Sequence, residues 1–119
     1  MKRLYEASSG VSEETKESVV KELRLGYMNL DEGMFEQARI NFQLAISLDP
    51  KCADAYWGLM LLKLNIQNED DLTENPVTYK NAINLPEYQK AMETASEEKE
   101  KIYDTLMEGV RAVNAGDNY

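Results

Sequence analysis

The chain has 119 residues, of which 43% are hydrophobic and 29% are charged, and this balance fits one globular domain rather than a disordered chain. Its 22 acidic and 13 basic residues give a net charge of −9, which repels phosphate backbones and anionic lipids and argues against nucleic-acid and membrane partners. One cysteine excludes an intramolecular disulfide, and the absence of a long apolar run excludes a transmembrane helix or signal peptide, so we expect a cytoplasmic protein.

The first predicted elements are an N-terminal tail and a helix. Residues 1–11 are weakly patterned and contain a Ser-Ser-Gly run, which predicts a flexible tail before a single domain over residues 12–115. Ser12 is a suitable N-cap, and the apolar residues after it recur at helical spacing. This pattern predicts a first helix over residues 12–31, followed by a break at Gly33. Its apolar stripe consists of Val20, Leu23, Tyr27 and Leu30.

Two further helices follow. A second stripe at helical spacing predicts a helix that stops at Pro50, because proline disfavours a helical residue before it. Residues 52–66 are apolar nearly all round, which predicts a third helix buried on several sides. The second stripe consists of Phe35, Ala38, Phe42, Ala45 and Leu48.

The C-terminal part alternates polar breaks with shorter helical patterns. Residues 67–71 form a polar break, and two prolines then predict a short helix over residues 76–84 and another over 86–95. Ser96 caps a last helix, which Gly116 ends. No segment alternates with the period of a strand, so we predict an all-α fold. The stripe of the last helix is Ile102, Leu106, Val110 and Val113.

Residues 19–50 resemble a tetratricopeptide repeat, a helical hairpin of about 34 residues. The likeness implies one full repeat over about 19–52 and the first helix of a partial second repeat from residue 53. The pattern then departs from the family, because one repeat length beyond Ala38 stands Leu72, which does not match. The matching residues are Leu25, Gly26, Gly33, Phe35, Ala38, Phe42, Ala45, Leu48, Asp49 and Pro50.

The stretch after this repeat is similar to a divergent bacterial repeat module that often occurs inside larger multidomain proteins. The likeness rests on residues 53–59, on residues 71–72 and on residues 86–91. Together the two resemblances imply a fragment of an α-α superhelix with an irregular C-terminal cap, made of helices over about 76–115.

In the tetratricopeptide arrangement, the stripes of the first and third helices line a concave groove. The resemblance therefore implies an apolar groove with an acidic rim, suited to an apolar helix or peptide with basic flanks. Some family members clamp a partner's C-terminal carboxylate with lysine and asparagine, but Leu23, Tyr27 and Gly58 stand at those positions. The residues expected to contact a partner are Val20, Leu23, Tyr27, Leu30, Asp31, Asp54, Trp57, Leu61 and Leu64.

An open apolar groove would expose more apolar surface than monomers usually tolerate, so something should cover it. The chain's own C-terminal helices are one candidate, since so few repeats do not close a core. A second copy of the chain, in a homodimer, and a foreign helix or peptide are the other two. Trp57 distinguishes these cases, because a core tryptophan is fully buried whereas a contact residue is partly exposed.

Residues that carry enzymatic chemistry are sparse. Histidine, the commonest general base, is absent, and Cys52 has no basic run nearby in the sequence to activate it. The acidic clusters at residues 69–71 and 97–100 lack the alternating ligands of a calcium loop, so no metal or cofactor is expected. We therefore expect a non-enzymatic protein-interaction or scaffold module. The alternative is a structural or self-associating helical domain of a larger bacterial protein.

Overall fold

The computed structural model describes residues 5–116, which are helical apart from the turns and the N-terminal segment. This range contains no strand, which confirms the prediction of an all-α fold. The molecule is elongated, with extents of 48 × 30 × 22 Å. Its elements are α1 (Glu13–Asp31), α2 (Phe35–Leu48), α3 (Ala53–Lys63), α4 (Asp70–Glu74), the 3₁₀ helix η1 (Lys80–Asn84), α5 (Pro86–Thr94), α6 (Glu97–Leu106) and α7 (Glu108–Asn114).

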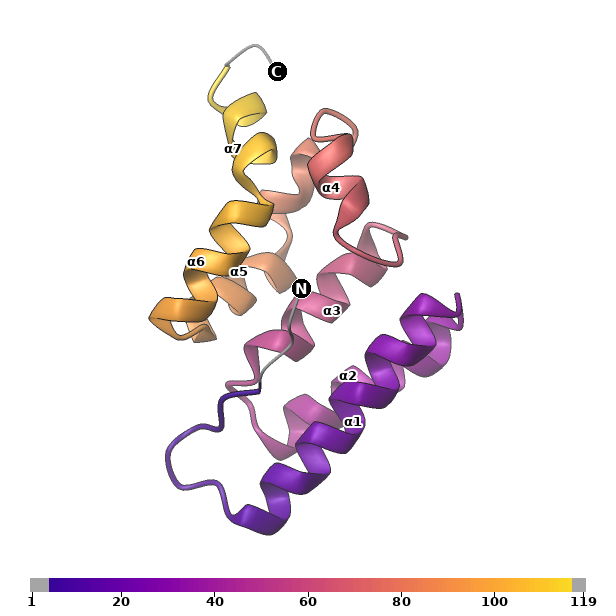
Figure 1. The fold of residues 1–119 in the computed structure, drawn as a ribbon, viewed down its shortest axis with the longest axis vertical. Coiled ribbons are helices and arrows are strands. Elements are labelled where there is room, and N and C mark those ends of the chain that lie inside the picture. The colour runs from indigo at the N-terminus through magenta and orange to yellow at the C-terminus, as the bar shows by residue number, and fades with distance from the viewer. Residues whose placement is uncertain (1–4, 117–119) are drawn as a thin grey trace.

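Helices α1 and α2 form an antiparallel hairpin at one end of the molecule (Figure 1). The Ser12 side chain caps α1 by accepting a hydrogen bond from the Thr15 amide at 3.1 Å. Gly33 has a φ of 76°, a left-handed conformation that favours glycine, and it turns the chain into α2. Both helices therefore begin and end close to the residues that the sequence predicts.

The ring of Phe42 fills the space between three helices. It is fully buried and lies against Gly26 of α1 and Gly58 of α3, where a β-carbon would overlap its ring atoms. Tyr27 contacts the same ring edge-on, with the two ring centroids 4.8 Å apart. The two glycines thus allow one aromatic side chain of α2 to join α1 and α3.

Helix α3 is the centre of the fold, between the hairpin and the C-terminal helices (Figure 1). Its residues Trp57, Met60 and Leu61 have no exposed surface, as expected for a helix that is apolar nearly all round. Helix α5 packs along α3, while α7 packs against α4 and η1. One core therefore continues from the hairpin to the C-terminal helices.

The C-terminal helix boundaries differ from the prediction. The polar segment after α3 contains the short helix α4, and η1 occupies only the end of the predicted helix over residues 76–84. The last predicted helix is divided into α6 and α7 at Met107, close to Gly109, which disfavours helix. Backbone hydrogen bonds from Met107 to Tyr103 and from Arg111 to Met107 bridge the division, so it is a local interruption.

Residues 5–11 are not a detached tail, in contrast to the predicted flexible segment. The Tyr5 ring packs against the core, and Tyr5 and Ser8 both hydrogen-bond to Asp49 at the end of α2. Residues 1–4 of the predicted tail lie outside the described residues. The described part of this segment therefore belongs to the fold.

Candidate functional site

The core-facing stripe of α1 differs by one position from the predicted stripe. Val20 is 45% exposed, and its neighbour Val19 takes the core position instead. Val19 lies seven residues, about two helical turns, before Gly26 and is therefore on the same side of α1. Because Gly26 faces the Phe42 ring, Val19 faces the core and Val20 faces solvent. The buried residues of α1 are Val19, Leu23, Gly26 and Leu30.

Trp57 is a core residue, so the expectation that it contacts a partner requires correction. Its indole ring stacks on Tyr103 of α6, with centroids 4.2 Å apart and planes 1° from parallel. Its Nε1 donates a hydrogen bond to Glu69 Oε1 at 3.0 Å. The chain's own C-terminal part thus covers the predicted groove at α3, and Trp57, Leu30 and Leu61 have no surface left for a partner.

The remaining predicted contact residues are spread between buried and exposed positions. Asp54 is buried, Tyr27 and Leu64 are half-buried, and Asp31 is exposed. Leu23 belongs to the core stripe of α1. The nine predicted residues therefore do not form one continuous accessible surface.

The buried Asp54 carboxylate attaches α6 to the first turn of α3. Lys99 Nζ lies 3.0 Å from Asp54 Oδ2, and the Tyr103 hydroxyl donates to Asp54 Oδ1 at 2.6 Å. Burial, together with the adjacent Asp54 charge, raises the pKa of the Tyr103 hydroxyl. The Asp54 backbone carbonyl also accepts a hydrogen bond from the Tyr27 hydroxyl, so one residue connects α1, α3 and α6.

A second buried carboxylate, that of Asp49, holds the N-terminal segment. The Tyr5 hydroxyl donates to Asp49 Oδ2 at 2.6 Å, and the Ser8 amide donates to the same oxygen at 3.2 Å. The Ser8 hydroxyl and the Lys51 amide donate to Oδ1. Although burial acts to raise it, the hydrogen bonds from Ser8 and Tyr5 hold the pKa of Asp49 below its ordinary value.

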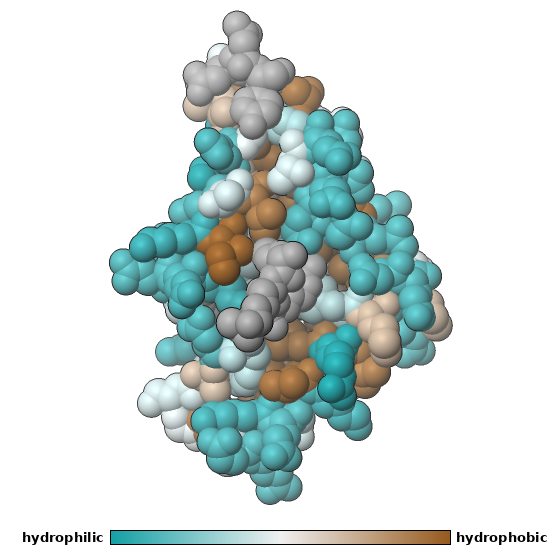
Figure 2. Space-filling model, in the orientation of Figure 1, coloured by the Kyte–Doolittle hydropathy of each residue, from teal (hydrophilic) through white to brown (hydrophobic). Residues whose placement is uncertain are grey.

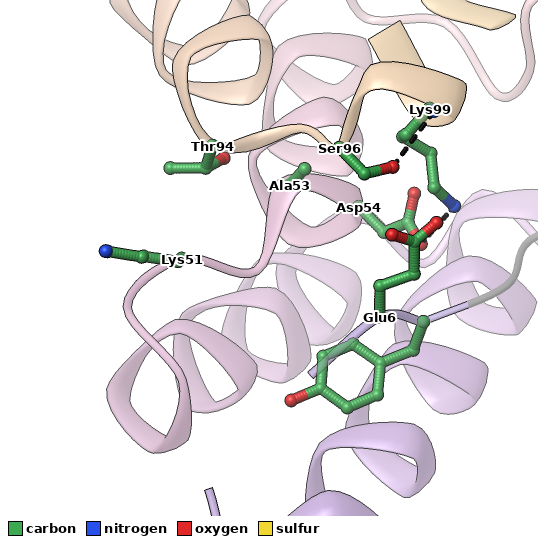
Figure 3. A pocket seen from close by; sticks show the side chains of 8 residues that line it. Glu6, Lys51, Ala53, Asp54, Thr94, Ser96 and Lys99 are labelled. Carbon is green, nitrogen blue, oxygen red and sulfur yellow. Dashed lines mark hydrogen bonds and ion pairs between the residues drawn. The ribbon is translucent and has the colours of Figure 1, made fainter. Parts of the chain in front are cut away.

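A small polar pocket lies beside the Asp54 carboxylate. Figure 3 shows Lys99 directed at Asp54, with Ser96 beside it and Glu6 approaching from the N-terminal segment. Ser96 Oγ accepts a hydrogen bond from the Lys99 amide at 3.1 Å, as the N-cap of α6. Lys99 binds Asp54 here, so the pocket lies where the N-terminal segment and the start of α6 meet the first turn of α3. The residues that line it are Tyr5, Glu6, Lys51, Ala53, Asp54, Thr94, Ser96 and Lys99.

Cys52 and the acidic side chains, which the sequence analysis considered and set aside for catalysis and metal binding, can be placed in the structure. Burial raises the pKa of the Cys52 thiol to about 12, so the thiol is protonated at neutral pH. Over residues 5–116, no group of three or more acidic, histidine or cysteine side chains is placed to hold a metal ion. Nor does the described part of the chain contain a helix long and apolar enough to cross a bilayer.

Among the described residues, the exposed large apolar side chains include a row on α2 that the sequence analysis did not identify. Ile40, Leu44 and Leu48, here named the α2 stripe, follow one another at four-residue spacing and are 47%, 45% and 39% exposed. Leu48 was expected in the core stripe of this helix. A second apolar row was the available signal, because it widens the apolar part of α2 beyond the stripe that a helix buried on one face needs.

The other exposed large apolar residues do not form such a row. Val20 is surrounded by charged neighbours on α1, among them Lys16, Lys21 and Arg24. The face in Figure 2 is mostly hydrophilic, with smaller apolar areas beside α1 and between α6 and α4. Isolated apolar residues are normal on protein surfaces. Within residues 5–116, the other exposed large apolar residues are Val20, Met28, Met34 and Val77.

Comparison of the chain with protein-family models, curated proteins and solved structures finds no match. The resemblance of residues 19–50 to a tetratricopeptide repeat therefore stays a prediction from the sequence.

Proposed function

We propose that this chain is a non-enzymatic protein-interaction module, built on one tetratricopeptide-type hairpin, that binds another polypeptide through the α2 stripe. The observation that carries the proposal is the row of Ile40, Leu44 and Leu48, which leaves apolar side chains about 40–50% exposed on one helix. The resemblance of the hairpin to the repeat family supports the same class of function. The covered surface around Trp57 does not support it.

Photo-crosslinking tests this proposal at a single residue. A photoreactive phenylalanine analogue placed at position 44 is expected to form a covalent adduct with a polypeptide in cells. The same analogue at Thr105, an exposed position on α6, serves as the matched control.

The adduct from position 44 should disappear when Ile40 and Leu48 are both changed to glutamate, with helix content unchanged by circular dichroism. Equal adduct yields from positions 44 and 105, or an adduct that survives the double substitution, would contradict binding through this stripe.

A further inference from the structure

We infer that the α2 stripe pairs with the same stripe of a second copy of this chain, as an antiparallel helix pair related by a two-fold axis near Leu44. The inference rests on the proposed function, because it takes the stripe to be a binding surface and names the polypeptide that occupies it. Three properties of α2 lead to it: the absence of charge along the stripe, the symmetry of its spacing, and the charges at its two ends.

The first property is the absence of charge around the stripe. The chain has 22 acidic and 13 basic residues, yet the polar residues that flank the stripe on α2 are Gln37, Asn41 and Ser47. A second copy also carries a net charge of −9, so a charged contact face would add like-charge repulsion at short range. Uncharged flanking residues on α2 remove this short-range repulsion along the stripe itself. On the side of α1, Asn41 donates a hydrogen bond to the Glu22 carboxylate, and the repulsion from such charges beside the stripe is screened by salt.

The second property is the symmetry of the spacing. Ile40 lies four residues before Leu44, and Leu48 lies four residues after it. In an antiparallel pair with a two-fold axis at Leu44, Leu44 meets its own copy and Ile40 meets Leu48 of the second copy. Such a face complements itself, which is the requirement for a two-fold dimer.

The third property is charge complementarity at the ends of the helix. Glu36 lies eight residues before Leu44 in the first turn of α2, and Lys51 lies seven residues after Leu44, in the exposed turn that follows the helix. The antiparallel register therefore brings Glu36 of one copy near Lys51 of the other, at both ends of the pair. Glu36 already pairs with Arg39 on its own helix, but its side chain is 80% exposed and is accessible to a second cation.

The size of the face sets the expected strength. Helix α2 has 14 residues, and at 1.5 Å per residue it is about 21 Å long. With the adjacent side of α1, the face is about 20 Å wide, which gives roughly 400 Å² per copy. This is about half of the area that a standard stable interface buries on each partner. We therefore expect a weak dimer that forms only at high protein concentration.

Sedimentation velocity of the full chain, from about 10 µM to about 1 mM, tests the pairing. We expect a reversible monomer–dimer equilibrium that Leu44→Glu weakens by about 100-fold or more, because two carboxylates then meet at the axis. Gln43→Glu adds the same charge at the next exposed position, on the side of α2 that faces α3, and should leave the equilibrium nearly unchanged.

A charge exchange tests the antiparallel register. Glu36→Lys and Lys51→Glu should each weaken the dimer, and the double variant, which keeps the net charge at −9, should restore it. A parallel pair would gain nothing from the double exchange, so an absence of rescue overturns the proposed register.

The outcomes separate the pairing from the proposed function. A chain that stays monomeric at about 1 mM, or a dimer that Leu44→Glu leaves intact, overturns the pairing. If position 44 nevertheless crosslinks a different polypeptide, the proposed function stands without the pairing of two copies. If the chain is monomeric and position 44 forms no adduct, both fail.

Discussion

At the scale of single residues, Phe42 is the contact on which the hairpin and α3 depend together. Its ring lies against Gly26 and Gly58, and a β-carbon at either glycine would come too close to the ring atoms. A helical glycine is usually replaced by alanine with a gain of about 0.5–1 kcal/mol. Here the sign should be reversed, because the ring is enclosed and has no free direction in which to move.

We therefore expect Gly58→Ala to lower the free energy of unfolding by about 1–3 kcal/mol in urea denaturation. Ser47→Ala, an exposed change on α2, should stay within about 0.5 kcal/mol of the parent. Adding Phe42→Leu to Gly58→Ala should cost less than the sum of the two single changes, because the smaller side chain relieves the overlap. If Gly58→Ala raised the free energy of unfolding, the Phe42 ring would have to lie farther from α3 than this structure places it.

Asp49 gives the fold a defined acid sensitivity. Its pKa is lower in the folded state than in the unfolded chain, so its contribution to stability is fully present above the ordinary aspartate pKa. That contribution is lost as the pH falls through the lowered folded-state value. Asp49→Asn should thus cost roughly 1–3 kcal/mol at neutral pH, and its difference from the parent should shrink as the solution becomes strongly acidic.

Urea denaturation at a series of pH values measures this difference. Tyr5→Phe removes one hydrogen-bond donor and keeps the ring, so it should cost less than Asp49→Asn. A difference between parent and Asp49→Asn that does not depend on pH would exclude a charged, hydrogen-bonded Asp49.

At the scale of elements, α6 depends on a few long side chains for its attachment. Lys99 and Tyr103 reach the Asp54 carboxylate, and both side chains are buried with it. Removing one member of a buried ion pair leaves the other charge without compensation, which costs about 3–5 kcal/mol. Lys99→Met should show a loss of this size in urea denaturation.

Lys101→Met is the matched control, because it removes the same charge from an exposed position on the same helix. It should change the free energy of unfolding by no more than about 0.5 kcal/mol. Combining Lys99→Met with Asp54→Asn should cost less than the two changes added, since the buried charge is then gone. A Lys99→Met variant as stable as Lys101→Met would show that the Lys99–Asp54 ion pair does not hold α6 in place, and would leave the Tyr103 hydrogen bond and the apolar contacts as its attachment.

Helix boundaries could be predicted where their signals are local. Ser12, Gly33 and Pro50 delimit α1 and α2 by capping, turning and stopping the chain, and each acts within a few residues. The interruption at Met107 has no such signal except the nearby Gly109. The inward turn of Val19 depends on where the Phe42 ring lies, which is a property of the packed hairpin rather than of α1.

The buried polar contacts could not be predicted either, because they too depend on how distant parts of the chain pack together. Asp49 and Asp54 bind groups more than 40 residues away in the chain. The sequence marked Asp49 only as part of the repeat pattern and Asp54 only as an expected partner contact, and neither role indicates a buried carboxylate. The apolar character of α3 did indicate that Trp57 is buried, but the identity of its cover, Tyr103 and Glu69, required the fold. The sequence shows that the residues of the α2 stripe are apolar, but it does not show that they are exposed to solvent.

At the scale of the whole molecule, three buried carboxylates hold distant parts of the chain against α3 and the end of α2. Asp49 binds the N-terminal segment, Asp54 binds α6, and Glu69 binds the Trp57 indole from the segment before α4. Both ends of the described chain are therefore attached to its middle. Such a structure should unfold as one cooperative unit, because loss of either end exposes the centre.

Trp57 allows this cooperativity to be measured, since it is the only tryptophan in the chain. A chain ending at Ala95 lacks α6 and α7, and with them the Tyr103 ring that stacks on the indole. We expect its tryptophan emission to shift to longer wavelength, its quenching by acrylamide to rise, and its urea midpoint to fall well below that of the parent.

Tyr103→Leu, which keeps α6, should give a smaller change in the same direction, because a large apolar side chain still covers part of the ring. If the shortened chain fails to fold, the test uses the Tyr103→Leu variant, whose tryptophan emission should also shift to longer wavelength. A shortened chain with the emission and urea midpoint of the parent would mean that the C-terminal helices are not what buries Trp57. The indole would then be covered by the hairpin and α5 alone, and Tyr88, whose ring centroid lies 6.5 Å from that of Trp57, would be the aromatic residue to substitute next.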